Sequence, residues 1–143
     1  ISNSWVVGST NINIGSNAGQ INQGGNSVAL GNQAGNLNQG VSSISIGDNA
    51  GNINQGVYSI AIGQQSAYSS QGQSAIAIGN QAGTGHQSNY GIAIGYGAAA
   101  NYQSTNAIAM GQSAGREFSR IFRTDRVRSH QKRRPHHSPA VKA

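Results

Sequence analysis

The sequence contains no cysteine and few charges. Its 143 residues include 9 Lys or Arg, 3 Asp or Glu and 2 Pro. Without cysteine no disulfide can form, and cysteine usage gives no indication of the redox compartment. No apolar run approaches the roughly 20 residues that a membrane-spanning helix needs. Charged residues make up only 8% of the chain, which is low for the free surface of a soluble monomer.

The few charges are unevenly distributed. All Lys and Arg residues lie at or after Arg116, and Asp48 is the only formally charged residue before it. The net charge of +6 therefore describes the C-terminal tail and not the body. Low hydrophobicity leaves two alternatives open, a disordered chain or a Gln/Asn-rich aggregation-prone tract. Strictly periodic isoleucines argue against disorder, and the aggregation-prone tract remains a less favoured alternative.

A five-residue motif recurs every sixteen residues, as in the Ser-Ile-Ala-Ile-Gly of residues 59–63. The glycines that close it are Gly15, Gly31, Gly47, Gly63, Gly79, Gly95 and Gly111. A glutamine ladder runs in phase, at Gln23, Gln39, Gln55, Gln71, Gln87 and Gln103. A fixed period of this length predicts a solenoid.

Each repeat is numbered here from the residue before its first isoleucine, so that Ser59 is position 1. Positions 2 and 4 are large and apolar, position 3 is small and position 5 is glycine, a pattern that predicts a short strand followed by a turn. A second strand is expected over positions 8 to 13. Isoleucines two residues apart do not form a helical stripe. We therefore predict an all-β parallel β-solenoid with 16-residue coils and two short strands per coil.

The alternation also predicts which residues face inward. Large side chains at positions 2 and 4 are expected to form the core ladder, namely Ile12, Ile14, Val28, Leu30, Ile44, Ile46, Ile60, Ile62, Ile76, Ile78, Ile92, Ile94, Ile108 and Met110. Position 3 should then face outward. Its small residues would allow close approach of another chain, forming an oligomer interface of Ala29, Ser45, Ala61, Ala77, Ala93 and Ala109. The glutamines are expected to hydrogen-bond along the axis like the amide ladders of cross-β structures.

The repeat array is predicted to span residues 11–115. Residues 1–10 are interpreted as an N-terminal cap or shortened coil, with a frayed end as the alternative, because terminal repeats of solenoids are usually atypical. Residues 116–143 form a basic tail, in which the spacing of apolar residues permits a short helix near 117–128. Because the chain opens with Ile1, it is interpreted as a processed product or a fragment.

The array changes along its length. Position 11 is apolar in the first three repeats and then becomes Ser69, Gly85 and Asn101. Tyrosines appear mainly in the later repeats, and they are Tyr58, Tyr68, Tyr90, Tyr96 and Tyr102. They either form a binding surface or supply the apolar packing that position 11 provides only in the earlier repeats.

Residues suited to catalysis are scarce. Asp48 and His86 occupy different positions of different repeats, and the body has no paired carboxylates and no triad candidate. We predict no catalytic residues, no cofactor and no metal site, because one carboxylate is too few for a hard cation. The histidines of the tail, His130, His136 and His137, are interpreted as part of a solvated basic segment rather than as metal ligands.

The tail has the composition of a polyanion-binding or assembly segment. Its candidate contacts to phosphate or sulfate groups are Arg126, Arg128, Lys132, Arg133 and Arg134. Nucleic-acid binding would depend on this segment. Ice binding and nucleic-acid binding are both less favoured than a structural role; for ice binding the reason is that threonine forms no ladder in the sequence.

The motifs at residues 27–31 and 59–63 resemble the head repeats of trimeric autotransporter adhesins, the YadA-like family. Similar repeats occur in surface-fibre proteins of phages and large viruses. The resemblance covers about residues 11–115, although the repeat here is longer than the family's common one. It implies a left-handed β-roll, a homotrimer, and adhesion to a host surface or matrix ligand from an extracellular, cell-surface or virion-surface location. The alternative is a virion or filament component docked through its basic tail.

Overall fold

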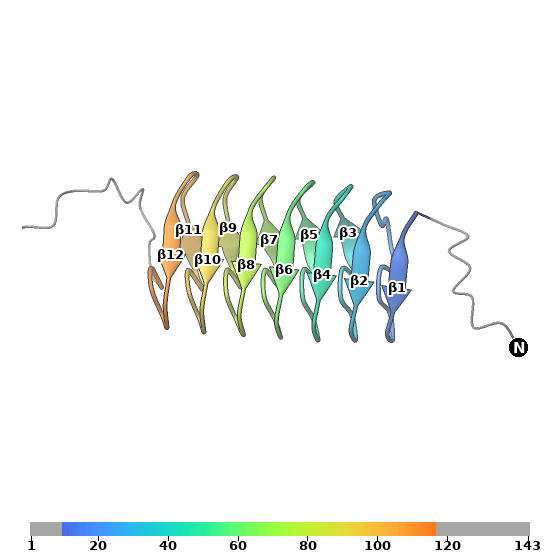
Figure 1. The fold of residues 1–143 in the computed structure, drawn as a ribbon, viewed down its shortest axis with the longest axis horizontal. Helices are drawn as coiled ribbons and strands as arrows, with labels where there is room; N and C mark the ends of the chain where they lie inside the picture. The colour runs from blue at the N-terminus through green and yellow to red at the C-terminus, as the bar shows by residue number, and fades with distance from the viewer. Residues whose placement is uncertain (1–9, 117–143) are drawn as a thin grey trace, which may run out of the picture.

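The computed structural model describes residues 10–116, and all of its regular structure is β. Parallel strands stack in coils of sixteen residues to form a β-solenoid of about six turns (Figure 1). With neighbouring strands about 4.8 Å apart, the rod is on the order of 30 Å long. The predicted fold class, an all-β parallel solenoid, is confirmed at this level.

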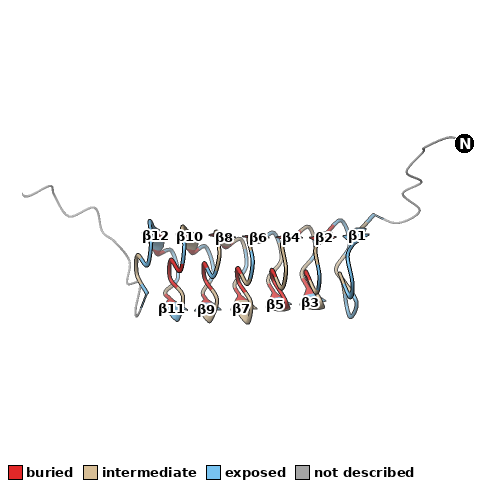
Figure 2. Ribbon diagram, turned by 90° about the horizontal axis from the view of Figure 1, so that it is seen from below, coloured by how far each residue is buried: buried red, intermediate tan, exposed pale blue. Residues whose placement is uncertain are grey.

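Two parallel sheets lie on opposite sides of the coil, and the seven-stranded one extends further than the five-stranded one (Figure 2). The seven-stranded sheet, called sheet A, contains β1 (Ile12–Ile14), β2 (Val28–Leu30), β4 (Ile44–Ile46), β6 (Ile60–Ile62), β8 (Ile76–Ile78), β10 (Ile92–Ile94) and β12 (Ile108–Met110). The five-stranded sheet, called sheet B, contains β3 (Leu37–Gln39), β5 (Ile53–Gln55), β7 (Ser70–Gln71), β9 (His86–Gln87) and β11 (Tyr102–Gln103). In sheet A each residue pairs with the residue sixteen positions later, as Ala61 does with Ala77.

The space between the sheets is filled by small side chains and by glutamine. Ala61, Ala77 and Ala93 of sheet A are fully buried, and so are Ala50 and Ala82 at position 8 of their coils. Sheet B contributes the glutamines of position 13, whose exposed fraction does not exceed 4% at any of the five strands. The interior therefore contains no large aliphatic side chain among the described residues.

The predicted core ladder is wrong, because its side chains face outward. All of them are half-buried or exposed: Ile12, Ile14, Val28, Leu30, Ile44, Ile46, Ile60, Ile62, Ile76, Ile78, Ile92, Ile94, Ile108 and Met110. The predicted oligomer interface is instead the interior, comprising Ala29, Ser45, Ala61, Ala77, Ala93 and Ala109. A coil this short encloses a narrow space in which branched side chains from every strand would collide. Alternation identifies residues that share a face, and a one-residue shift exchanges the faces.

The predicted turn glycines are confirmed by their backbone geometry. Gly15, Gly31, Gly47, Gly63, Gly79, Gly95 and Gly111 have φ values between 109° and 131°. L-residues rarely adopt this conformation. Stacking adds a second requirement, since a Cβ atom on Gly63 would lie 2.7 Å from the carbonyl carbon of Gly79 in the next coil.

Substitution of two of these glycines should separate backbone strain from the stacking clash. Gly111 has a φ of 109°, but a Cβ there would meet no atom within 4 Å. Gly111→Ala should therefore lower the free energy of unfolding only by the strain, roughly 1–3 kcal/mol. Gly63→Ala should lower it by clearly more. Urea unfolding followed by circular dichroism measures both, and equal losses would contradict the stacking argument.

Candidate functional site

The buried glutamines connect the two sheets through the interior of each coil. The Nε2 atom of Gln55 donates to the carbonyl of Ile44, at 2.7 Å, and Gln71 donates to Ile60 at the same distance. Gln39, Gln87 and Gln103 make the corresponding bond at 2.7–2.8 Å. The predicted axial contact forms at two steps, Gln23 to Gln39 at 3.1 Å and Gln71 to Gln87 at 3.2 Å. The main bond of each glutamine thus runs across the coil rather than along it.

The coil around Gln55 has the most complete polar network. Its Oε1 atom accepts hydrogen bonds from Ser45, at 2.6 Å, and from Ser43, at 3.2 Å. Ser45 is the only serine at position 3, where the neighbouring coils carry alanine. The Oε1 atoms of Gln71 and Gln103 are buried and have no partner among the described residues. Each glutamine is therefore held mainly by its Nε2 bonds. The oxygens of Gln39 and Gln87 accept from the glutamine of the preceding coil, whereas the oxygen of Gln55 accepts from two hydroxyls.

We expect Gln55→Leu to destabilise the coil, because it leaves the Ile44 carbonyl and the Ser45 hydroxyl without their bonds. A buried polar group without its partner costs about 1–3 kcal/mol. The double variant Gln55→Leu with Ser45→Ala should recover part of this loss, since both side chains become apolar. Gln73→Leu, at an exposed glutamine, is the control. The free energy of unfolding of the Gln55→Leu, Ser45→Ala and double variants is measured by chemical unfolding. If the loss in the double variant equals the sum of the two single losses, Ser45 and Gln55 are not coupled.

The outer surface of sheet A forms a continuous apolar face, which we call the isoleucine face. It consists of the position 2 and position 4 side chains named above. At the ends of the rod these residues are widely exposed, with Ile12 at 45%, Ile108 at 48% and Met110 at 64%. Elsewhere their neighbours in the stack cover them only partly. Contiguous apolar surface of this kind usually marks an interaction site.

The tyrosines do not form one surface. Tyr58, Tyr90, Tyr96 and Tyr102 are exposed, but they occupy positions 16, 6 and 12 of their coils and so lie at different corners. Tyr68, at position 10, is half-buried and accepts a hydrogen bond at its carbonyl from Ile53. Tyr102 stacks on His86 of the preceding coil, at a centroid distance of 5.4 Å and an interplanar angle of 10°. The tyrosines of the described residues therefore do not combine into a single binding patch.

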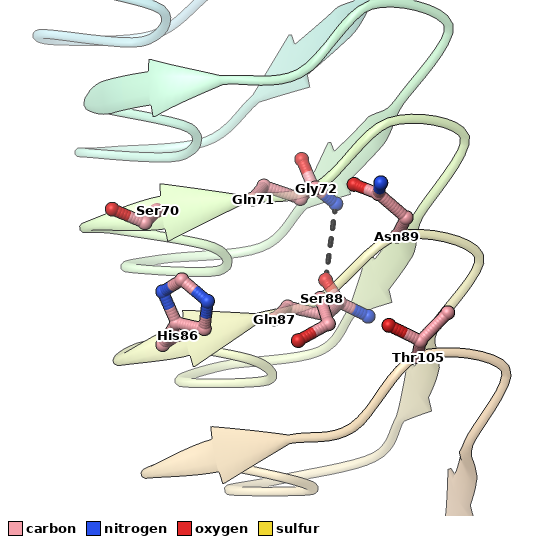
Figure 3. Close-up of a pocket in the computed structure, with 8 residues that line it drawn as sticks. All are labelled: Ser70, Gln71, Gly72, His86, Gln87, Ser88, Asn89 and Thr105. Carbon is pink, nitrogen blue, oxygen red and sulfur yellow. Dashed lines mark hydrogen bonds between the residues drawn. The ribbon is translucent and has the colours of Figure 1, made fainter.

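A recess of about 250 Å³ lies on the outer side of sheet B (Figure 3). Ser70 and His86 border it on β7 and β9, and Ser88, Asn89 and Thr105 border it from the segments that follow β9 and β11. Gly72, whose N–H donates to the Gln87 carbonyl, contributes backbone to the lining. None of the described residues that line the recess is Asp, Glu, Lys or Arg. This site was not predicted from the sequence, although the change of position 11 to Ser69 and Gly85 marks the coils that form it.

The titratable residues of the body remain apart. The side-chain amide of Asn32 donates to Asp48 at 2.9 Å and holds the pKa of that carboxyl below its usual value, with Asn49 and Gln64 acting in the same direction. Asp48 stands at position 6 and His86 at position 12 of a different coil. No group of three His, Cys, Asp or Glu residues within residues 10–116 could hold a metal ion.

Several predicted features fall outside the described residues. They are the cap predicted over residues 1–10, of which only Thr10 is described, the possible helix near 117–128, and the polyanion-contact candidates Arg126, Arg128, Lys132, Arg133 and Arg134. Among residues 10–116 no helix is long and apolar enough to cross a membrane. Comparisons of the chain with protein-family models, with curated proteins and with solved structures found no match.

Proposed function

We propose that this chain is a structural module of a surface fibre, an adhesin head in which three copies assemble around their isoleucine faces. The observation that carries the proposal is the isoleucine face itself, which extends along the whole of sheet A. Resemblance to trimeric autotransporter heads supplies the number of copies and the left-handed coil. The module would act outside the cell, on a cell or virion surface.

A second and third copy of the chain are well suited to cover this face. Every coil presents branched or long aliphatic side chains at the same two positions, so the face is as long and as regular as the rod. A cyclic assembly brings the same face of each chain to its axis. Burying the remaining half of one isoleucine side chain contributes about 1 kcal/mol, and the face has fourteen such positions.

The other surfaces of the rod are almost uncharged, and they carry polar ladders beside exposed apolar side chains such as Ile21 and Val41. On sheet B the side chains of Asn22, Asn38 and Asn54 form an amide ladder with N–O distances of 2.9 Å. At another corner Asn32 and Asn49 surround Asp48. A trimer would display these ladders outward as a rigid, amide-rich surface for attachment. In this proposal the chain catalyses no reaction, and its role is to hold the attachment surface at a fixed position with regularly spaced side chains.

The assembly can be tested with asparagine substitutions on the two sides of the coil. Light scattering after size exclusion should give three times the 14.7 kDa of one chain. Ile62→Asn combined with Ile78→Asn should abolish the trimer, because amides would enter the apolar interface. Ile53→Asn is the matched control. Ile53 is also half-buried, but it lies on sheet B, so this variant should remain trimeric.

Two results would contradict the proposal. One is a wild-type chain that is a folded monomer at micromolar concentration. The other is an Ile62→Asn, Ile78→Asn variant that keeps the wild-type mass. Loss of the trimer in the Ile53→Asn variant as well would indicate general destabilisation and would remove the support that the face provides.

A further inference from the structure

The outer surface of sheet B changes character halfway along the rod. In the first three coils position 12 holds Asn22, Asn38 and Asn54, which have left-handed φ values of 54–56° and are joined by amide hydrogen bonds. In the next three coils it holds Ser70, His86 and Tyr102, whose φ values are not positive and which lie in strands β7, β9 and β11. The closed amide ladder thus gives way to a hydroxyl, an imidazole and a phenol.

The His86 ring is covered on one side only. His86 pairs in register with Tyr102 of the next coil and with Ser70 of the preceding coil. Its stack with Tyr102 occupies one face of the imidazole. The other face lies toward Ser70, whose side chain ends at Oγ and is too short to cover a ring. His86 is exposed, and its ring borders the recess beside Ser70 (Figure 3).

The rest of the recess offers hydrogen-bonding groups without formal charge. Within residues 10–116 the hydroxyls of Ser70, Ser88 and Thr105 have no hydrogen-bond partner, in contrast to the engaged hydroxyls of the interior serines. The Oδ1 atom of Asn89 accepts from the Gln73 N–H at 2.9 Å, which fixes the side chain and leaves its amide nitrogen for another acceptor. The recess thus combines one aromatic face with several neutral donors and acceptors.

We propose that this recess binds a neutral sugar residue of a host-surface glycan. The C–H face of a pyranose ring can lie on the open imidazole face, while its hydroxyls meet Ser70, Ser88 and Asn89. The volume of about 250 Å³ is below the usual range for drug-sized ligands and suits a single ring. Sialylated or sulfated sugars are disfavoured, because the described lining residues include no Lys or Arg to pair with their anionic groups.

This inference rests on the proposed attachment role and assigns it a ligand class. Sheet B lies opposite the isoleucine face, so the recess stays open when three chains meet through sheet A (Figure 2). A trimer carries three copies of the recess. Weak binding by each copy then adds up to stable attachment to a surface dense in glycans.

The test uses the full-length chain and a glycan array that carries neutral glycans ending in galactose, mannose or N-acetylglucosamine, together with sialylated and sulfated glycans. Ser70→Tyr should cover the open face of His86 as Tyr102 covers the other, and position 12 already accommodates tyrosine. Binding to neutral glycans should weaken by about tenfold or more. Ser16→Tyr is the matched control, because Ser16 is exposed in the first coil at position 6, where Tyr96 stands in a later coil.

The outcomes distinguish the recess from the rest of the molecule. The proposal is supported if the wild type and the Ser16→Tyr variant bind neutral glycans and the Ser70→Tyr variant does not. The Ser70→Tyr variant must also keep the wild-type mass in light scattering. It is overturned if no neutral glycan binds, if Ser70→Tyr binds as well as wild type, or if only sulfated or sialylated glycans are retained. A wild-type chain that binds neutral glycans as a monomer would refute the trimer and leave the recess assignment standing.

Discussion

The width of the coil interior determines the rest of this structure. Sixteen residues closed into two short strands and their turns leave space for methyl groups, hydroxyls and one extended side chain per coil. Ala61 and Ala77 are fully buried in this space, and the glutamines of sheet B cross it. Because bulky apolar side chains are excluded, they occupy the other face of the same strands. The apolar surface that most domains bury within one chain is here on the outside.

This arrangement gives polar and apolar interactions separate roles. Within a chain, backbone ladders and the glutamine bonds hold one sheet to the other, as at Gln55 and Ile44. Such bonds are directional, and a buried amide without its partner is costly, so they specify one register between the sheets. Between chains, the isoleucine face would provide the non-directional burial that a narrow interior cannot. On this view the folding of the coil and the assembly of the fibre depend on different side chains of the same three-residue strand.

The sequence predicts the period, the strands and the glycine turns, because each depends on local spacing. Gly63 and its equivalents are needed because their φ values are positive and, where another coil follows, because a Cβ atom would collide with the backbone of that coil. The sequence does not predict which face of Ile60–Ile62 is inside, since that depends on the cross-section of the coil. The sequence also predicts hydrogen bonds between glutamines along the axis, but it does not predict that most of these side chains donate across the coil to the carbonyls of sheet A. The pairing of Ser70 with His86 follows from the sixteen-residue period, but the period does not show that the two residues and the turn after β9 together border a recess.

The exact sixteen-residue register has a consequence for how such a molecule changes length. A coil contacts only the coil before it and the coil after it, through residues that are equivalent in each. Gain or loss of one whole repeat by unequal recombination would therefore lengthen or shorten the rod while leaving the stacking of the remaining coils in place. Insertion of another number of residues within a strand would shift the glycine turns out of register with the next coil. The length of the rod can thus vary in discrete steps of one coil while the surface of each remaining coil is unchanged.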